Sequence, residues 1–149
     1  MMKRATLSVA LAIAFMAGVS AQDKPNFAGT WKASGSFNSW TITVEDSRMT
    51  VTMTVAGNSE STVYLLDGTP STMTMEGPNG PIETVYTSTW EGAVLVTTIE
   101  GPNSTRIERR SIEADGTMKV QSTFTIMQGK PAPPPPPGAG AGMVFKRVK

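Results

Sequence analysis

The feature that most constrains this chain is an alternation of apolar and polar residues that begins near Gly29 and continues almost to the C-terminus. Residues 48–55 show it best, because Met49, Val51 and Met53 alternate there with arginine and threonine. Successive side chains of a β-strand point to opposite faces, so this period predicts strands with one buried and one exposed face. Clusters of Gly, Asn, Asp and Pro interrupt the alternation about every eight to twelve residues, as turns between antiparallel strands do.

These intervals predict about ten short strands and no helix of useful length. The first expected strand contains Trp31, and the others cover residues 40–44, 48–55, 61–66, 72–75, 82–90, 93–100, 104–112, 117–127 and 143–148. A sheet of this many strands loses most of its exposed edge by curling and closing. We therefore expect an all-β fold, an antiparallel up-and-down meander closed into a barrel of about eight to ten strands, with a β-sandwich as the alternative.

The first 21 residues have the three parts of a secretory signal peptide. Met1 to Arg4 is short and basic, residues 5–19 are almost wholly apolar, and Val19-Ser20-Ala21 has the small-x-small pattern of a cleavage site. The apolar run is shorter than the roughly 20 residues that a membrane-spanning helix needs. We expect cleavage after Ala21, export to the periplasm or the extracellular space, and a single barrel domain at residues 22–149.

The composition excludes several kinds of reactive site. The chain has no Cys and no His, so it lacks the thiol and imidazole groups of many catalytic and metal sites. Cleavage removes Lys3 and Arg4, and 13 basic residues less these two leaves 11 against 12 acidic ones, a net charge of −1. Proteins that bind nucleic acid usually present a basic face. We therefore expect no enzymatic activity, no metal, no cofactor and no nucleic-acid partner.

The segment Phe27-Ala28-Gly29-Thr30-Trp31-Lys32 resembles the G-x-W opening strand of the calycin superfamily, which comprises lipocalins, fatty-acid-binding proteins and avidins. It is most similar to small secreted bacterial lipocalin-like proteins that open with F-x-G-T-W-K. The resemblance implies that Gly29 and Trp31 form a structural motif at the closed end of the barrel. It also implies that a basic residue of the last strand packs across Trp31, with Arg147 as the first candidate and Lys146 as the second. Such a cation over an indole is worth about 0.5 to 2 kcal/mol.

Several methionine and aromatic side chains share the expected inward faces of the strands. Methionine adapts to irregular shapes and is common on promiscuous apolar surfaces, so these side chains are candidates for binding a lipophilic molecule. The alternative is that they fill the interior of a solid barrel. The candidate ligand-binding residues are Trp40, Met49, Met53, Met73, Met75, Tyr86, Trp90, Met118 and Phe124, and Thr84 and Ser88 could add polar groups inside.

The Pro/Gly-rich segment at residues 128–142 departs from the alternation. Proline lacks the backbone donor of a sheet ladder, so Pro131 and the run Pro133 to Pro137 are expected to stay unpaired in a long connection to the last strand. Such a connection can be a simple loop insertion. It can also be a docking site for a protein partner, as proline-rich segments are elsewhere.

Two further surfaces have plain structural explanations. A threonine-rich face suits exposed strand positions, and a cluster of charges on residues 106–110 is expected to form a solvated edge that discourages aggregation. If Arg109 instead points inward beside Ile107, it becomes a candidate for binding an anion. The sequence therefore favours an exported, non-enzymatic binding protein for a small apolar or amphipathic molecule. The alternative is a protein-binding or inhibitor module with a solid barrel and loop-mediated contacts.

Overall fold

A computed structural model describes residues 23–137 and 142–149 of the chain. The expected signal peptide and its cleavage site lie outside the described residues, as do four residues of the Pro/Gly-rich loop. The described residues form β-strands and turns, and none of them belongs to a helix with the length and apolar character needed to cross a membrane.

The strand bounds follow the expected alternation closely, with most ends within three residues of the prediction. The strands are β1 (Gly29–Ala33), β2 (Ser39–Glu45), β3 (Arg48–Val55), β4 (Asn58–Leu65), β5 (Ser71–Gly77), β6 (Gly80–Glu91), β7 (Val94–Glu100), β8 (Thr105–Ile112), β9 (Met118–Met127), β10 (Lys130–Pro131) and β11 (Met143–Arg147).

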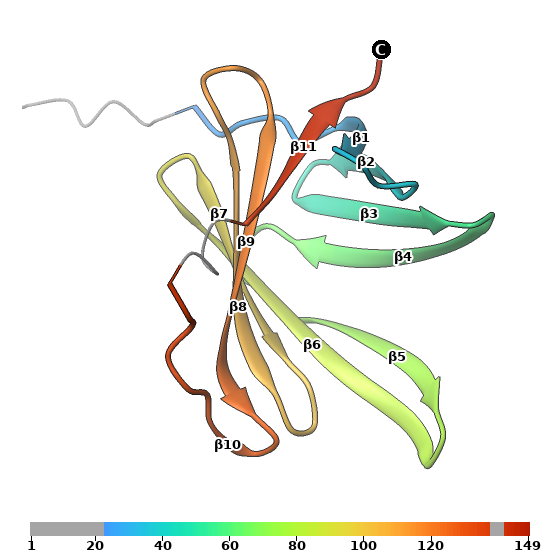
Figure 1. Cartoon of the computed structure of the whole chain (residues 1–149), viewed down its shortest axis with the longest axis vertical. Coiled ribbons are helices and arrows are strands. Elements are labelled where there is room, and N and C mark those ends of the chain that lie inside the picture. The colour runs from blue at the N-terminus through green and yellow to red at the C-terminus, as the bar shows by residue number, and fades with distance from the viewer. Residues whose placement is uncertain (1–22, 138–141) are drawn as a thin grey trace, which may run out of the picture.

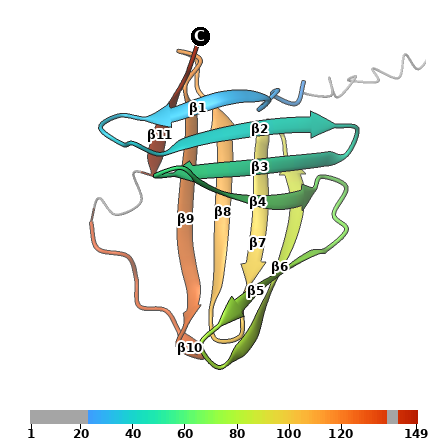
Figure 2. The same ribbon diagram turned by 90° about the vertical axis from the view of Figure 1, so that its right-hand side faces the viewer.

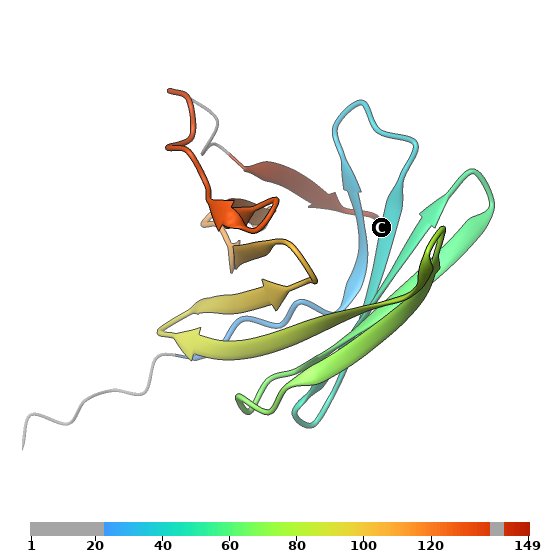
Figure 3. The ribbon, with the colours of Figure 1, turned by 90° about the horizontal axis from the view of Figure 1, so that it is seen from below.

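All the strand pairs are antiparallel, and they follow one path in the order β4-β3-β2-β1-β11-β9-β8-β7-β6-β5, with β10 attached to β9. In Figure 2, β1 to β4 run across the direction of β6 to β9, so that the two halves of the sheet face each other at a steep angle. Seen from below, the strands form a ring (Figure 3). The prediction of an all-β antiparallel barrel is thus confirmed, and the path of ten strands agrees with the expected number.

The ring is nearly closed, because β4 and β5 end the path without a backbone ladder between them. Side chains cross this seam instead. The Ser71 hydroxyl donates to the Val63 carbonyl over 2.6 Å, and the rings of Tyr64 and Tyr86 meet edge to face with centroids 5.3 Å apart. The seam therefore has no backbone ladder between β4 and β5, and side chains of β5 and β6 contact β4 across it.

Local sequence explains the tight turns that set the strand register. Ala56 and Gly57 join β3 to β4 with φ angles of 48° and 84°, the two positive values that a two-residue type I′ hairpin turn requires. Gln128 and Gly129 make the same kind of turn with φ angles of 52° and 71°. This second turn corrects one expectation, because Pro131 does pair with β9 as part of β10. The strand lies at an edge, where a missing proline donor is tolerated, and the Ala132 amide donates to the Thr125 carbonyl over 2.9 Å.

The core lies inside the barrel towards the end that carries Trp31. Its buried apolar residues are Phe27, Trp31, Ile42, Met49, Val51, Tyr64, Tyr86, Leu95, Ile99, Met118, Val120 and Phe145. Trp31 and Met118 have no exposed surface at all. By contrast Val44 and Val55, which the alternation places on the same faces as the core residues, are more than a third exposed because they lie at strand ends.

Candidate functional site

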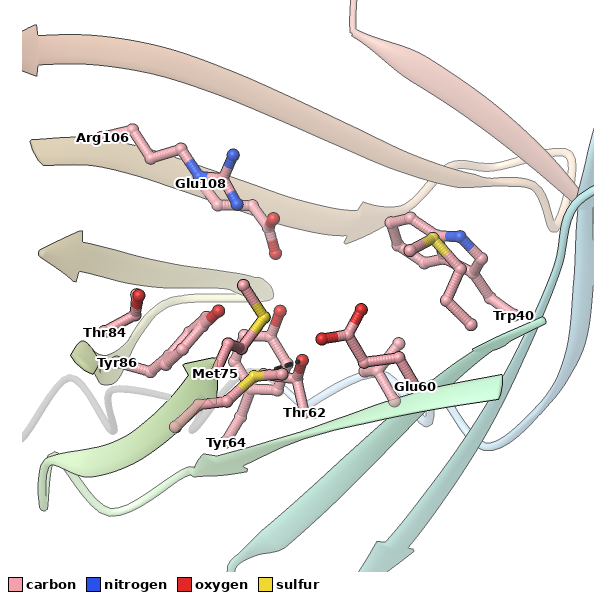
Figure 4. Close-up of a pocket in the computed structure, with 12 residues that line it drawn as sticks. Trp40, Glu60, Thr62, Tyr64, Met75, Thr84, Tyr86, Arg106 and Glu108 are labelled. Carbon is pink, nitrogen blue, oxygen red and sulfur yellow. Dashed lines mark hydrogen bonds between the residues drawn. The ribbon is translucent and has the colours of Figure 1, made fainter. Parts of the chain in front are cut away.

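A cavity of about 250 Å³ occupies the barrel interior beyond the core. Its lining comes from β2 to β6 and from β8: Trp40, Val51, Met53, Glu60, Thr62, Tyr64, Met73, Met75, Thr84, Tyr86, Arg106 and Glu108. Figure 4 shows these side chains projecting from facing walls into a common space. The cavity reaches solvent, because Glu60 and Met75 of its lining are exposed.

One wall of the cavity is soft and apolar. Trp40 and Met53 are direct neighbours across the β2–β3 ladder. Met73 and Met75 are two residues apart on β5 and therefore share its inward face. The Thr62 hydroxyl lies 3.5 Å from the Met73 sulfur and donates to it, which fixes that side chain against β4.

The other wall is charged, and here the structure corrects the sequence. The residues expected to form a solvated edge alternate across β8, so that Arg106, Glu108 and Arg110 point inward while Arg109 points out. Arg109 is an exposed residue that pairs with Glu91, with 2.5 Å between Nη2 and Oε2, and so it is not an interior anion site. Cross-strand register explains the placement, because Arg110 lies opposite the buried Leu95 and Glu108 opposite the buried Thr97.

Arg110 connects the cavity wall to the core. It is 1% exposed, and its Nη2 lies 2.8 Å from Oε1 of Glu108. Its guanidinium carbon lies 5.6 Å from the ring centroid of Trp40 and 5.2 Å from that of Tyr64, and its Nη1 lies 3.6 Å from the Met49 sulfur. A buried guanidinium is stable only with such partners, because desolvation of an unpaired charge is costly.

The two tyrosines of the cavity are held in their neutral form. Burial raises the pKa of Tyr64 far above its ordinary value, and the negative charge of Glu108 adds to the rise. Burial also raises the pKa of Tyr86, while the positive charge of Arg106 and a hydrogen bond with Thr62 oppose that rise. Both phenols therefore remain hydroxyl donors in the cavity at neutral pH.

The structure places the nine candidate residues from the sequence in four different environments. Those that line the cavity are Trp40, Met53, Met73, Met75 and Tyr86. Met49 and Met118 are fully buried in the core and do not line it. Phe124 lies opposite Arg106 in the β8–β9 ladder but is 41% exposed and outside the lining. Of the expected polar groups, Thr84 lines the cavity, whereas Ser88 is buried deeper and shares a hydrogen bond of 2.8 Å with Thr97.

Trp90 lies elsewhere, beside the segment that precedes β1. Its ring stacks on Phe27 with centroids 5.9 Å apart, and the Lys24 ammonium lies 5.4 Å from its centroid. A separate depression of about 520 Å³ borders these residues and Leu66. The alternation placed Trp90 on the correct face of β6 but could not show that the N-terminal segment covers it.

The same end of the barrel holds the Trp31 motif. The Arg147 guanidinium lies 4.4 Å from the Trp31 ring centroid, and its Nη1 donates to the Ala28 carbonyl over 2.6 Å. The Trp31 indole donates to the Phe27 carbonyl over 2.9 Å. A Cβ at Gly29 would lie 2.9 Å from Arg147 Nη1 at a φ of 137°, so the glycine leaves room for the arginine. Lys146 instead lies opposite Lys32 in the register of β1 and β11, and its side chain is exposed.

Sequence reasoning missed Arg106, Glu108 and Arg110 as interior residues, although a signal was present. They alternate in phase with Ile112, which packs against the core, and out of phase with the exposed Arg109. The same period that identified the methionines therefore applies to the charges. Among the described residues, no group of three or more His, Cys, Asp and Glu side chains could hold a metal ion.

No protein-family model matches the chain, and no curated protein matches it in sequence. In three dimensions the chain is similar to the crystal structure of a secretary abundant heat soluble (SAHS) protein from Ramazzottius varieornatus, with a TM-score of 0.57 and 13% sequence identity. The match covers 86% of this chain and 98% of that protein. At this identity the likeness shows the fold, a nearly closed antiparallel barrel, and nothing of the activity.

Proposed function

We propose that this protein is an exported, non-enzymatic, lipocalin-like binding protein for a small amphipathic molecule. The observation that carries the proposal is the cavity of about 250 Å³ with one apolar and one charged wall. Ligand sites in proteins combine apolar and aromatic linings with a few placed polar groups in this way. The apolar part of the ligand would contact Trp40, Met53 and Met73, and its polar part would face the hydroxyl and charged groups of β4, β6 and β8.

The volume limits the ligand. Sites for drug-sized molecules usually measure about 300 to 1,000 Å³, so this cavity suits a molecule at or below the small end of that range. Because the cavity reaches solvent beside Glu60 and Met75, a longer molecule could leave one end outside. Export rests on the signal peptide expected at residues 1–21.

The test is titration of the purified chain, residues 22–149, with an environment-sensitive lipophilic dye followed by fluorescence. The Met53→Trp variant adds bulk inside the cavity and should weaken dye binding about tenfold or more. The matched control is Met143→Trp, which places the same bulk on an exposed methionine of β11 outside the cavity.

Circular dichroism and thermal melts show whether each variant is folded. If Met53→Trp unfolds the chain, Met75→Trp at the exposed rim of the cavity serves in its place. Equal dye binding by a folded cavity variant and by the control would contradict the proposal. A chain that binds no dye and carries no bound molecule in native mass spectrometry would instead favour a solid barrel with loop-mediated contacts to a protein.

A further inference from the structure

Two side chains of opposite charge line the cavity and have no ionic partner among the described residues. The ion pairs found there join Arg109 to Glu91 and Arg110 to Glu108, which leaves Arg106 and Glu60. Arg106 is half-buried, and its Nε is shielded from solvent without a hydrogen-bond partner. A guanidinium in such a place is costly to desolvate, so an anion that reaches it would gain a strong charge-assisted contact.

Glu108 does not neutralise Arg106. It lies two residues further along the same face of β8, and its Oε1 accepts from Arg110 at 2.8 Å. The formal charges of Arg106, Glu108 and Arg110 sum to +1. The charged wall therefore favours an anionic group near Arg106.

Glu60 gives the cavity a second charged group, opposite in sign to Arg106; we call these two side chains the poles of the cavity. It lies on β4, where the register places it opposite Met53, and it is exposed at the rim. Figure 4 shows Arg106 and Glu60 on different walls with the cavity between them. Both charges act electrostatically on the Tyr86 hydroxyl, because Arg106 lowers the pKa of Tyr86 and Glu60 raises it.

We propose that the cavity selects a small zwitterion. Its anionic group pairs with Arg106, its cationic group pairs with Glu60, and the apolar segment between them lies against Trp40 and Met53. This inference rests on the proposed function, because it names the ligand class of the same cavity. A purely anionic ligand would face Glu60 without compensation, and a purely cationic one would face Arg106, so each lacks one of the two contacts that the zwitterion makes.

The probes are four unbranched eight-carbon molecules that differ in their end groups: ω-aminooctanoate, octanoate, octylamine and octanol. Isothermal titration at neutral pH and low salt should show ω-aminooctanoate binding about tenfold more tightly than octanoate and octylamine, since each charged contact is worth about that factor. Shorter and longer ω-amino acids then report the separation of the two poles as the chain length that binds best.

Two variants and two controls assign the poles. Arg106→Gln should bring ω-aminooctanoate down to the affinity of octylamine, and Glu60→Gln should bring it down to that of octanoate. Arg109→Gln and Glu83→Gln make the same changes on exposed residues outside the cavity and should leave the ranking intact. In Glu60→Lys the two poles become cationic, so octanedioate should replace ω-aminooctanoate as the preferred ligand.

The outcomes separate this inference from the function on which it rests. Octanoate binding as tightly as ω-aminooctanoate in the unaltered chain, or a ranking unchanged in Arg106→Gln and Glu60→Gln, would overturn the zwitterion assignment. If octanol and the lipophilic dye bind while ω-aminooctanoate has no advantage, the proposed function stands and the inference is wrong. If neither the dye nor any of the four probes binds, both are wrong.

Discussion

Oε1 of Glu108 and Nη2 of Arg110 lie 2.8 Å apart inside the barrel, where Glu108 lines the cavity and Arg110 is buried behind it. Arg110 also faces the rings of Trp40 and Tyr64, so one ion pair orients residues of three strands. An ion pair of this kind is costly to desolvate, and its cost is offset only while both partners are present.

Replacing one partner of this pair should therefore destabilise the fold. Glu108→Leu leaves Arg110 buried without its counter-ion, and we expect a loss of about 3 to 5 kcal/mol in the free energy of unfolding, measured by urea denaturation. The double variant with Arg110→Met should recover most of that loss. For comparison, Glu91→Ala breaks the exposed pair with Arg109 and should cost less than about 1 kcal/mol. A cost for Glu108→Leu as small as that for Glu91→Ala would show that the interior is well hydrated.

A second polar contact in the interior joins the hydroxyls of Ser88 and Thr97 at 2.8 Å. Both side chains are 1% exposed, so neither can turn to water when its partner is removed. Ser88→Ala or Thr97→Val alone should cost about 1 to 3 kcal/mol, while the double variant should cost less than the sum of the two. Thermal melts of the four chains give the coupling directly. Strictly additive losses would mean that the two hydroxyls do not depend on each other.

The alternation of apolar and polar residues predicted the strands of the barrel well, because side chains alternate between the two faces along every single strand. It identified β3 with its bounds unchanged and placed Met53, Met73 and Tyr86 on the face that lines the cavity. It failed where the outcome depends on neighbouring strands. Whether an inward side chain reaches the core, the cavity or solvent is set by its partner strands, which is why Met118 is in the core and Phe124 is exposed.

The charges on β8 were misjudged for a related physical reason. An arginine is usually exposed, and only specific partners make its burial tolerable. The partners of Arg110 are Tyr64 and Trp40, which lie on strands about 45 to 70 residues earlier in the chain. The local sequence around Arg110 therefore could not predict them. The partner of Trp31 could be expected from the sequence because the resemblance to calycins implied a basic residue of the last strand, and the register of β1 and β11 places Arg147 directly beside Trp31.

Tyr64 should make the stability of the protein depend on pH under alkaline conditions. Burial, helped by the charge of Glu108, raises its pKa in the folded state above the unfolded value of about 10. The neutral phenol is thus favoured by folding, so its contribution is complete below about pH 10 and is lost as the pH rises towards the folded pKa. Thermal midpoints between about pH 9 and pH 12 should fall for the unaltered chain and fall less steeply for Tyr64→Phe. Burial also raises the pKa of Tyr86, which should add to the slope in the same direction. Identical slopes for the two chains would show that Tyr64 ionises as freely when folded as when unfolded.

The last prediction concerns the closed end, where Arg147 contacts both the ring of Trp31 and the backbone of the segment before it. Its guanidinium lies 4.4 Å from the indole centroid and also donates to the Ala28 carbonyl. Trp31→Ala removes a fully buried ring and should cost about 3 to 5 kcal/mol in the free energy of unfolding.

Arg147→Met keeps the length of the side chain but loses the cation and the hydrogen bond, which should cost about 1 to 3 kcal/mol in a urea melt. Lys146→Met removes the adjacent exposed cation and should cost less than about 0.5 kcal/mol. Because both methionine variants lose one positive charge, a difference between them measures the contacts of Arg147 with the Trp31 ring and the Ala28 carbonyl and not the net charge. Equal losses for Arg147→Met and Lys146→Met would mean that Arg147 adds nothing to the apolar packing of Trp31 and its hydrogen bond to the Phe27 carbonyl.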